Sequence, residues 1–283
     1  MTTSLISIPK SRAFPARARM AFDALNRFAA HPKYGASVEQ IKAGVRARAA
    51  RPKDEVDSRD LVAYLIQDNQ DLWQQLLNTP FCKKMGEAAA DDEQVLKGFK
   101  WYMVQDFLYC IKLMIFETDR SSRATTSAVF DISADRIAGD ASYAKDLLQT
   151  CIQAQPEGLA IDEYKVLQAS PTKAMSSYTD FQITTAQDAS WVLALVAMIP
   201  CIQSYYKIAA DLKDNSKHKD TIWYKLWVEE NAKYEDSTVH QKQFFAENFD
   251  AWKDHYDEAT RIFRRACQGE IDLWAVAENP GDV

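Results

Sequence analysis

The sequence is poor in glycine and proline, with only 8 glycines and 9 prolines among 283 residues. Tight turns between strands depend on glycine, asparagine and proline, so this composition disfavours a turn-rich all-β fold. It favours long helices joined by few connections. Apolar residues make up 47% of the chain and charged residues 26%, which is typical of a globular protein with a large buried core.

Cysteine motifs are also lacking. The chain has five cysteines, an odd number, and none of them forms a CxxC pair. This pattern disfavours a disulfide framework or a zinc site, and it favours a reducing compartment, so we expect a cytoplasmic protein. Residues 1–20 carry four basic residues and no acid, which leaves a mitochondrial transit peptide open as the alternative to a plain N-terminal arm.

Several classes of function lack their signature. No run of 18 uninterrupted apolar residues occurs, so we expect no membrane span. The net charge of −6 and pI of about 5.4 make nucleic acid an unsuitable partner. Four histidines are few for a di-iron oxidase, and neither a glycine-rich phosphate loop nor a Gly-x-Ser-x-Gly elbow is present. We therefore expect no metal and no cofactor.

Helical periodicity dominates what is present, and no segment alternates with a period of two. The pattern predicts one all-α bundle. The expected organisation is an N-terminal extension over residues 1–58 (an arm with short helices around 22–28 and 38–50), a helical domain over 59–278, and a disordered tail over 279–283. Within the domain the expected helices cover 61–77, 92–117, 143–154, 174–186, 190–213, 221–234 and 239–268.

Asp106 is out of place in its helix, because residues 99–116 are apolar almost all round. A buried carboxylate is costly unless it is paired, shifted in pKa or exposed to a wet cavity. One interpretation is a carboxylate that ties helices together, and the other is a residue that lines a pocket. Tyr109, three residues later, projects from nearly the same face.

Pro200 interrupts the second strongly apolar helix and is followed at once by Cys201. A proline inside a helix removes a hydrogen bond and kinks the helix, which opens space beside the thiol and beside Tyr205, one turn later. The plain alternative is that Cys201 is a small buried hydrophobe, as most buried cysteines are. Both interpretations stay open on the residues alone.

Five segments then match, in order, the motifs of a known family. They are an aromatic-rich helix with Gln-Asp and Tyr, a Ser-Pro-Thr turn followed by Tyr-Thr, a segment ending in Pro-Cys and aromatics, a Tyr-x-x-Trp helix, and a closing Glu-x-x-x-Trp-x-x-Ala motif. The chain resembles the TenA/thiaminase II family in all five, over residues 99–113, 169–181, 193–209, 222–231 and 267–277. Thr79, Pro80 and Phe81 are similar to the His-Pro-Phe that precedes the first motif.

The resemblance implies a haem-oxygenase-like multi-helical bundle without haem, which hydrolyses thiamin or an aminomethyl aminopyrimidine in thiamin salvage or degradation. It also implies a homo-oligomer, a dimer or a tetramer. By motif, Cys201 corresponds to the nucleophile, Glu270 to the general acid/base and Asp106 to the residue that binds the ring amino group. The residues that line the site by the same correspondence are Tyr109, Tyr178 and Tyr205.

Some positions depart from the family pattern. No histidine occurs in 143–154, where Gln149 or Thr150 aligns with the family's histidine. Asn231 stands where a substrate-contacting tyrosine is expected, and Gln203 replaces an aromatic residue. These changes predict a pocket whose walls differ. They leave open a salvage hydrolase, a paralogue with another heteroaromatic substrate, and a non-catalytic protein that binds or senses a small molecule.

Overall fold

The computed structural model describes residues 59–283, and every regular element in that part is a helix. The all-α prediction is therefore confirmed. The N-terminal extension, with its expected short helices and the alternative of a transit peptide, lies outside the described residues. The helices are α3 (Leu61–Asp68), α4 (Gln70–Leu77), α5 (Pro80–Glu87), α6 (Glu93–Ser121), α7 (Ser127–Ile152), α8 (Glu163–Gln168), α9 (Lys173–Asp188), α10 (Trp191–Ala194), α11 (Ile199–Asn215), α12 (Glu229–Asn231), α13 (Glu235–Glu247), α14 (Phe249–Trp252) and α15 (Tyr256–Ala275).

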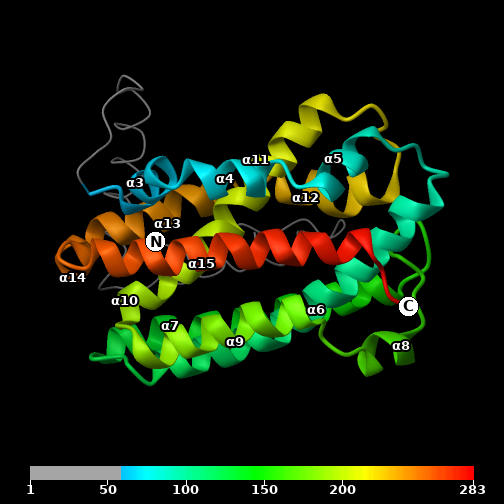
Figure 1. The fold of residues 1–283 in the computed structure, drawn as a ribbon. Helices are drawn as coiled ribbons and strands as arrows, with labels where there is room; N and C mark the ends of the chain where they lie inside the picture. Colours follow the sequence, from blue (N-terminus) through cyan, green and yellow to red (C-terminus); the bar gives the residue numbers. More distant parts are fainter. Residues whose placement is uncertain (1–58) are drawn as a thin grey trace, which may run out of the picture.

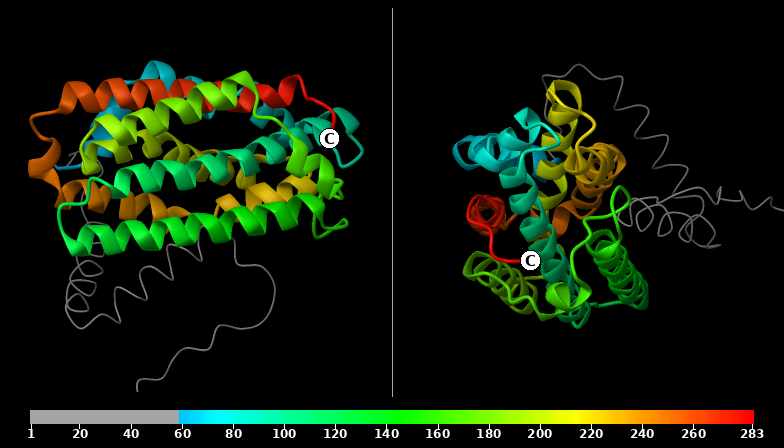
Figure 2. Two further views of the ribbon diagram at one scale, coloured as in Figure 1. Left: turned by 90° about the horizontal axis from the view of Figure 1, so that it is seen from below. Right: turned by 90° about the vertical axis from the view of Figure 1, so that its right-hand side faces the viewer.

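The long helices run side by side along the molecule (Figures 1 and 2). The central helix α6 packs against α7 and α9, while α15 lies between α9 on one side and α4 on the other. The helix α11 packs on α15 and on α13. As expected from its apolar sequence, α6 is buried along most of its length. Functional side chains that point inward from α6, α9, α11 and α15 therefore meet in one core.

Side-chain caps fix where the long helices begin. Asp92 accepts a hydrogen bond from the backbone N–H of Val95 (3.0 Å) at the start of α6, and Thr172 accepts one from Met175 (3.2 Å) at the start of α9. Thr126 does the same for α7, which begins 16 residues before the expected helix 143–154. The expected boundary was wrong because the weakly apolar stretch before 143 hides a helix whose partner is α6.

Two expected helices are broken by asparagine. The Asn69 side chain donates to the Leu65 carbonyl (2.7 Å) and separates α3 from α4. The Asn248 side chain donates to the Phe244 carbonyl (2.8 Å) at the end of α13, so that 239–268 is not one helix. Asparagine side chains compete with the backbone for such carbonyls, which is why they end helices.

Pro200 does not lie within a continuous helix. The segment 190–213 consists of α10, a 3₁₀ turn over Leu195–Met198, and α11, with Pro200 in the first turn of α11. Proline is accepted there because the first-turn N–H groups have no intrahelical partner. The prediction of a break at this point is correct, but the prediction of a kink in mid-helix is wrong. Trp191–Asn215 is long and apolar enough to span a membrane, and 83% of its apolar window is buried inside the protein, as in a core helix.

A buried ion pair joins α6 to α7 and α10. The Arg120 guanidinium is fully buried and contacts the Glu117 carboxylate at 2.6 Å, while Arg136 on α7 reaches the same carboxylate at 3.3 Å. Arg120 also lies over the Trp191 ring, 4.4 Å from its centroid. Burial lowers the pKa of Arg120 to about 10.

The closing residues 279–283, which the sequence predicts to be a disordered tail, lie beside α6. The Asp282 carboxylate is 3.4 Å from the Lys97 ammonium, and Gly281 lies against the Trp101 ring.

Candidate active site

The structure places all six expected site residues in the interior of the bundle. Four helices supply them, and each side chain is at most 3% exposed: Asp106 and Tyr109 on α6, Tyr178 on α9, Cys201 and Tyr205 on α11, and Glu270 on α15. Residues more than 160 positions apart in sequence thus share one core.

The Tyr178 hydroxyl connects α9 to α15 by donating a hydrogen bond to Oε1 of Glu270 (2.8 Å). Burial raises the pKa of Tyr178 well above its ordinary value, and the negative charges of Glu270 and Cys201 add to the effect. Tyr178 therefore keeps its proton at any physiological pH and remains a donor. Because Glu270 and Cys201 both act on this hydroxyl, the carboxyl and the thiol both lie close to it in the core.

A second pair of tyrosines links Asp106 to the same group. The Tyr102 and Tyr205 hydroxyls are hydrogen-bonded to each other at 2.9 Å. Burial raises the pKa of Tyr102, and the charge of Asp106 raises it further. Burial also raises the pKa of Tyr205, and the charge of Glu270 adds to that effect. Tyr102 was not among the expected site residues. Its position one turn before Asp106 was the signal that could have identified it.

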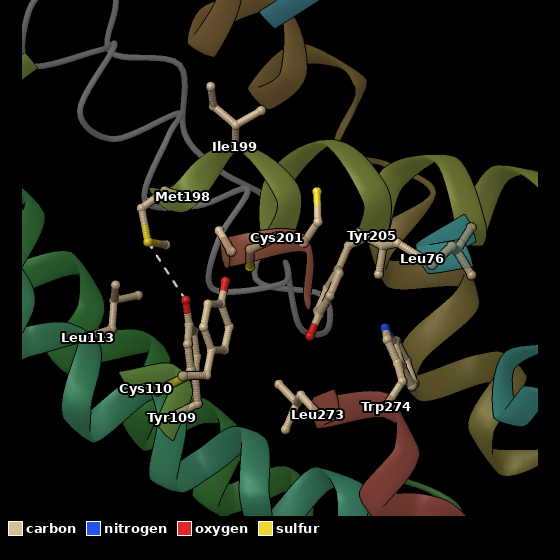
Figure 3. Close-up of a cluster of buried hydrophobic side chains, with 14 of the residues drawn as sticks. Leu76, Tyr109, Cys110, Leu113, Met198, Ile199, Cys201, Tyr205, Leu273 and Trp274 are labelled. Carbon is tan, nitrogen blue, oxygen red and sulfur yellow. Dashed lines mark hydrogen bonds between the residues drawn. The ribbon is translucent and has the colours of Figure 1, made fainter. Parts of the chain in front are cut away.

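Trp274 closes one side of this group and was also not anticipated (Figure 3). Its indole stacks on the Tyr102 ring with centroids 4.2 Å apart and 3° between the planes. It lies 5.7 Å from the Tyr205 ring and meets Trp227 edge-on at 5.1 Å. Trp227 is in a short π-helical segment (Tyr224–Val228), a rare geometry that often marks functional sites.

Tyr109 is held in place by hydrogen bonds to Gln182 and Met198. It accepts a hydrogen bond from the Gln182 amide (3.0 Å) and donates to Sδ of Met198 (3.7 Å), the contact drawn in Figure 3. Its ring stacks with that of Tyr178, with centroids 5.7 Å apart. Gln182, which also donates to the Ala197 carbonyl (3.3 Å), is a further residue that sequence reasoning missed.

The Gln105 side chain joins the aromatic-rich helix motif to the Ser-Pro-Thr motif. Its side chain donates to the Ser170 carbonyl (3.1 Å) and accepts from the Thr172 N–H (2.8 Å). The Ser-Pro-Thr turn is thereby tied to α6 beside Asp106. This contact sets where α9 begins and so where Tyr178 lies.

The side chains at the positions that depart from the family pattern do not lie where we expected them. Gln203 is not in the pocket wall, because its amide donates to the Thr238 carbonyl and to Gln241 on α13, both at 3.0 Å. Asn231 is buried and donates to the Trp227 carbonyl (2.8 Å), which closes the π-helical turn.

Gln149 is exposed and Thr150 bonds to its own helix, so neither fills the place expected for a histidine. The neighbouring Cys151 is buried instead, and its pKa rises to about 12 because of burial and the charge of Asp106. Asp106 is thus close enough to α7 for its charge to act on the Cys151 thiol. Within residues 59–283, no three His, Cys, Asp or Glu side chains gather closely enough to hold a metal ion.

The chain is 25% identical to an aminopyrimidine aminohydrolase of Halalkalibacterium halodurans over 169 residues, which are 59% of this chain and 70% of that protein. It is 22% identical to an aminopyrimidine aminohydrolase of Helicobacter pylori over 173 residues, 58% of this chain and 72% of that protein.

A solved structure described as a TenA homologue protein from P. horikoshii OT3 superposes with a TM-score of 0.63 at 22% identity, covering 78% of this chain and 99% of that one. This likeness confirms the expected haem-oxygenase-like helical fold. The family model described as TENA/THI-4/PQQC matches residues 66–279, which include every residue of the buried group. The chain belongs to the TENA/THI-4/PQQC family.

Proposed function

We propose that this chain is a hydrolase that replaces an amine on the methylene carbon of an aminopyrimidine by a hydroxyl, with Cys201 as nucleophile. The observation that carries the proposal is the burial of one thiol, two carboxyl groups and four tyrosines together in the core of the bundle. The carboxyl groups are those of Asp106 and Glu270. Such a set supplies a nucleophile, acid/base groups and flat walls for an aromatic ring.

The reaction needs an activated ring, because an aminopyrimidine is a poor electrophile. A carboxyl group hydrogen-bonded to the ring nitrogen and amino group withdraws electron density, and Asp106 is assigned this role. The Cys201 thiolate then adds to a ring carbon, which places negative charge on the ring. Return of that electron pair toward the methylene carbon breaks the C–N bond there and releases the amine.

Glu270 transfers the protons in this reaction. It gives a proton to the departing amine and then takes one from the water that adds to the methylene carbon. Loss of the Cys201 thiolate restores the aromatic ring. The net change is one amine replaced by one hydroxyl, with water consumed and no oxidant or reductant required. The Tyr178 hydroxyl orients Glu270 throughout, since its raised pKa keeps it protonated.

Two relatives support the substrate class. Both the H. halodurans and the H. pylori proteins bear the name aminopyrimidine aminohydrolase, and each aligns over more than two thirds of its length. We extend this activity to the present chain and place it in thiamin salvage or degradation. A cytoplasmic homo-oligomer, dimer or tetramer, belongs to the same proposal.

Incubation of the purified chain with aminomethyl aminopyrimidine, and separately with thiamin, tests this function. Hydroxymethylpyrimidine is quantified by chromatography in both reactions. Product from either substrate supports the proposal and identifies the preferred leaving group. Absence of product from both, with the protein folded by circular dichroism, contradicts it.

A second candidate is a paralogue that binds another heteroaromatic compound, with or without turnover. It is favoured by Asn231, whose side chain closes the Trp227 turn instead of presenting a tyrosine hydroxyl. Quenching of tryptophan fluorescence by a panel of amine-bearing heteroaromatic compounds distinguishes the two candidates. Saturable binding of a compound other than an aminopyrimidine, without product from either pyrimidine, favours the paralogue.

A further inference from the structure

The buried site needs a route for its substrate. Cys201, Tyr205 and Glu270 are each at most 3% exposed, so a ring-sized molecule cannot reach the thiol without movement of a side chain. The wall that moves must lie between this group and a space that opens to solvent.

One such space adjoins the site. A surface cavity of about 490 Å³ lies where α4, the start of α5 and the end of α15 meet. Its polar lining comes chiefly from α4, the residues that follow it and the turn after α15, and includes Asp71, Gln74, Gln75, Asn78 and Glu278. The volume is within the range of cavities that hold small organic ligands.

The charges of this lining are already neutralised. Asp71 forms a two-pronged ion pair with Arg264 (2.8 and 2.9 Å), and Glu278 pairs with Lys84. The polar side chains left to meet a ligand are chiefly amides, which donate and accept hydrogen bonds without demanding a charge, and the rest of the lining is mostly apolar. A flat, polar, neutral ring such as an aminopyrimidine suits this lining.

Trp274 is common to the cavity and to the buried site. Trp274 is one of the residues around the cavity although it is fully buried, and its indole stacks on Tyr102 and contacts Tyr205. In Figure 3 Tyr205 is drawn between Cys201 and Trp274, and the Tyr205 and Trp274 rings are 5.7 Å apart. Trp274 is four residues after Glu270 on α15 and therefore shares its face.

Two features favour movement of the Trp274 side chain. Its indole N–H is buried and has no hydrogen-bond acceptor among residues 59–283, a costly arrangement that rotation toward the cavity relieves. It also lies in the last turn of α15, which ends at Ala275 before a 3₁₀ turn over Val276–Glu278. Helix ends are held by fewer backbone hydrogen bonds than helix interiors.

We propose that the cavity between α4, α5 and the end of α15 is the substrate entrance, and that the Trp274 side chain is the gate between it and the Cys201 pocket. The inference rests on the proposed function only in taking that pocket as the substrate's destination.

Alkylation of Cys201 by iodoacetamide in the full-length chain tests the route without requiring turnover. Labelling of each cysteine is followed over time by peptide mass spectrometry. Gln75→Trp places an indole in the cavity from an exposed position, and Gln70→Trp is the matched control on the same helix outside the lining. We expect Gln75→Trp to slow labelling of Cys201 about tenfold, and Gln70→Trp to leave it unchanged. Equal rates in the two variants overturn the entrance.

Trp274→Ala tests the gate. We expect Cys201 to be labelled about tenfold faster than in the wild type, while Cys110, which is buried on α6, keeps its slow rate. An equal rise at both cysteines contradicts a local gate. If neither pyrimidine is turned over but Gln75→Trp still protects Cys201, the entrance stands and the proposed function fails.

Discussion

The hydroxyl of Tyr178 lies 2.8 Å from Oε1 of Glu270, and both side chains are fully buried. A tyrosine that stays protonated is a permanent donor, so this bond fixes the orientation of the carboxyl group without exchanging a proton. In the proposed reaction Glu270 transfers protons, and its orientation determines whether it reaches the departing amine.

Tyr178→Phe removes this bond and keeps the ring. We expect kcat/KM to fall about 10- to 100-fold, because a hydrogen bond to a charged group is worth about 1.5–3 kcal/mol. Steady-state kinetics measure the loss, with circular dichroism as the check on folding. Unchanged kcat/KM would show that the bond plays no part in catalysis.

Gly269 provides the room that the Tyr178 ring occupies. A Cβ at residue 269 would lie 2.2 Å from Cδ2 of Tyr178, closer than any real contact. Overpacking costs about 1–3 kcal/mol, and alanine recovers roughly 1 kcal/mol over glycine in a helix. Gly269→Ala should therefore destabilise the protein by up to about 2 kcal/mol in urea unfolding and should also reduce activity.

The control for this prediction is a double-mutant cycle. In a Tyr178→Ala background the ring is gone, so Gly269→Ala should no longer destabilise. The same penalty in both backgrounds would mean that the clash is with another group.

Asp106→Asn separates the two interpretations that the sequence leaves open. If Asp106 binds the ring amino group, the affinity for an aminopyrimidine should fall about 10- to 100-fold, the value of a charged hydrogen bond. Calorimetric titration measures the affinity. Asp140→Asn, a buried carboxylate on α7 near Arg120, is the control that should leave binding unchanged. Unaltered affinity in Asp106→Asn would favour a purely structural carboxylate.

Alkaline pH should destabilise the protein. Burial raises the pKa of Cys82 and of Cys151 to about 12 from the ordinary value of 9.0, and raises that of Tyr178 well above 10.0. The folded state keeps these protons while the unfolded chain releases them. Stability is therefore retained below pH 9 and lost above it, by about 1.4 kcal/mol per pH unit for each cysteine, and Tyr178 adds to the loss only above pH 10.

The melting temperature between pH 7.5 and 10.5 measures this effect. Absorbance at 295 nm reports tyrosinate, and the signals of Tyr102, Tyr178 and Tyr205 should appear only on unfolding. A melting temperature that rises across this range would contradict the account.

The fold and the burial of Asp106 and Cys201 were predictable from the sequence because their signals are local. The apolar stretch of α6 with one acid at its centre points to Asp106, and the Pro-Cys pair points to Cys201. The resemblance added Glu270, which has no signal of its own in an amphipathic helix. All three are buried in one core, and their roles stay a prediction.

The other features of the core could not be predicted, because they depend on contacts between segments that are far apart in the sequence. Gln182 and Tyr109 are 73 residues apart, and Met85 accepts the Trp223 indole bond across 138 residues. Gln203 was misplaced because a helical pattern does not say which neighbour a polar residue faces, and α13 supplied its partners. Trp274 belongs to the closing motif, but its stacking on Tyr102 could not be predicted, since it arises only when α6 and α15 meet.

The most direct test of the central claim is hydroxymethylpyrimidine release by Cys201→Ser, compared with the wild type and with Cys82→Ser. Cys82 is equally buried but lies on α5, so its substitution makes the same chemical change outside the site. The account predicts loss of turnover in Cys201→Ser with the fold intact, and near wild-type turnover in Cys82→Ser. Full activity in Cys201→Ser would contradict the assignment of Cys201 as the nucleophile.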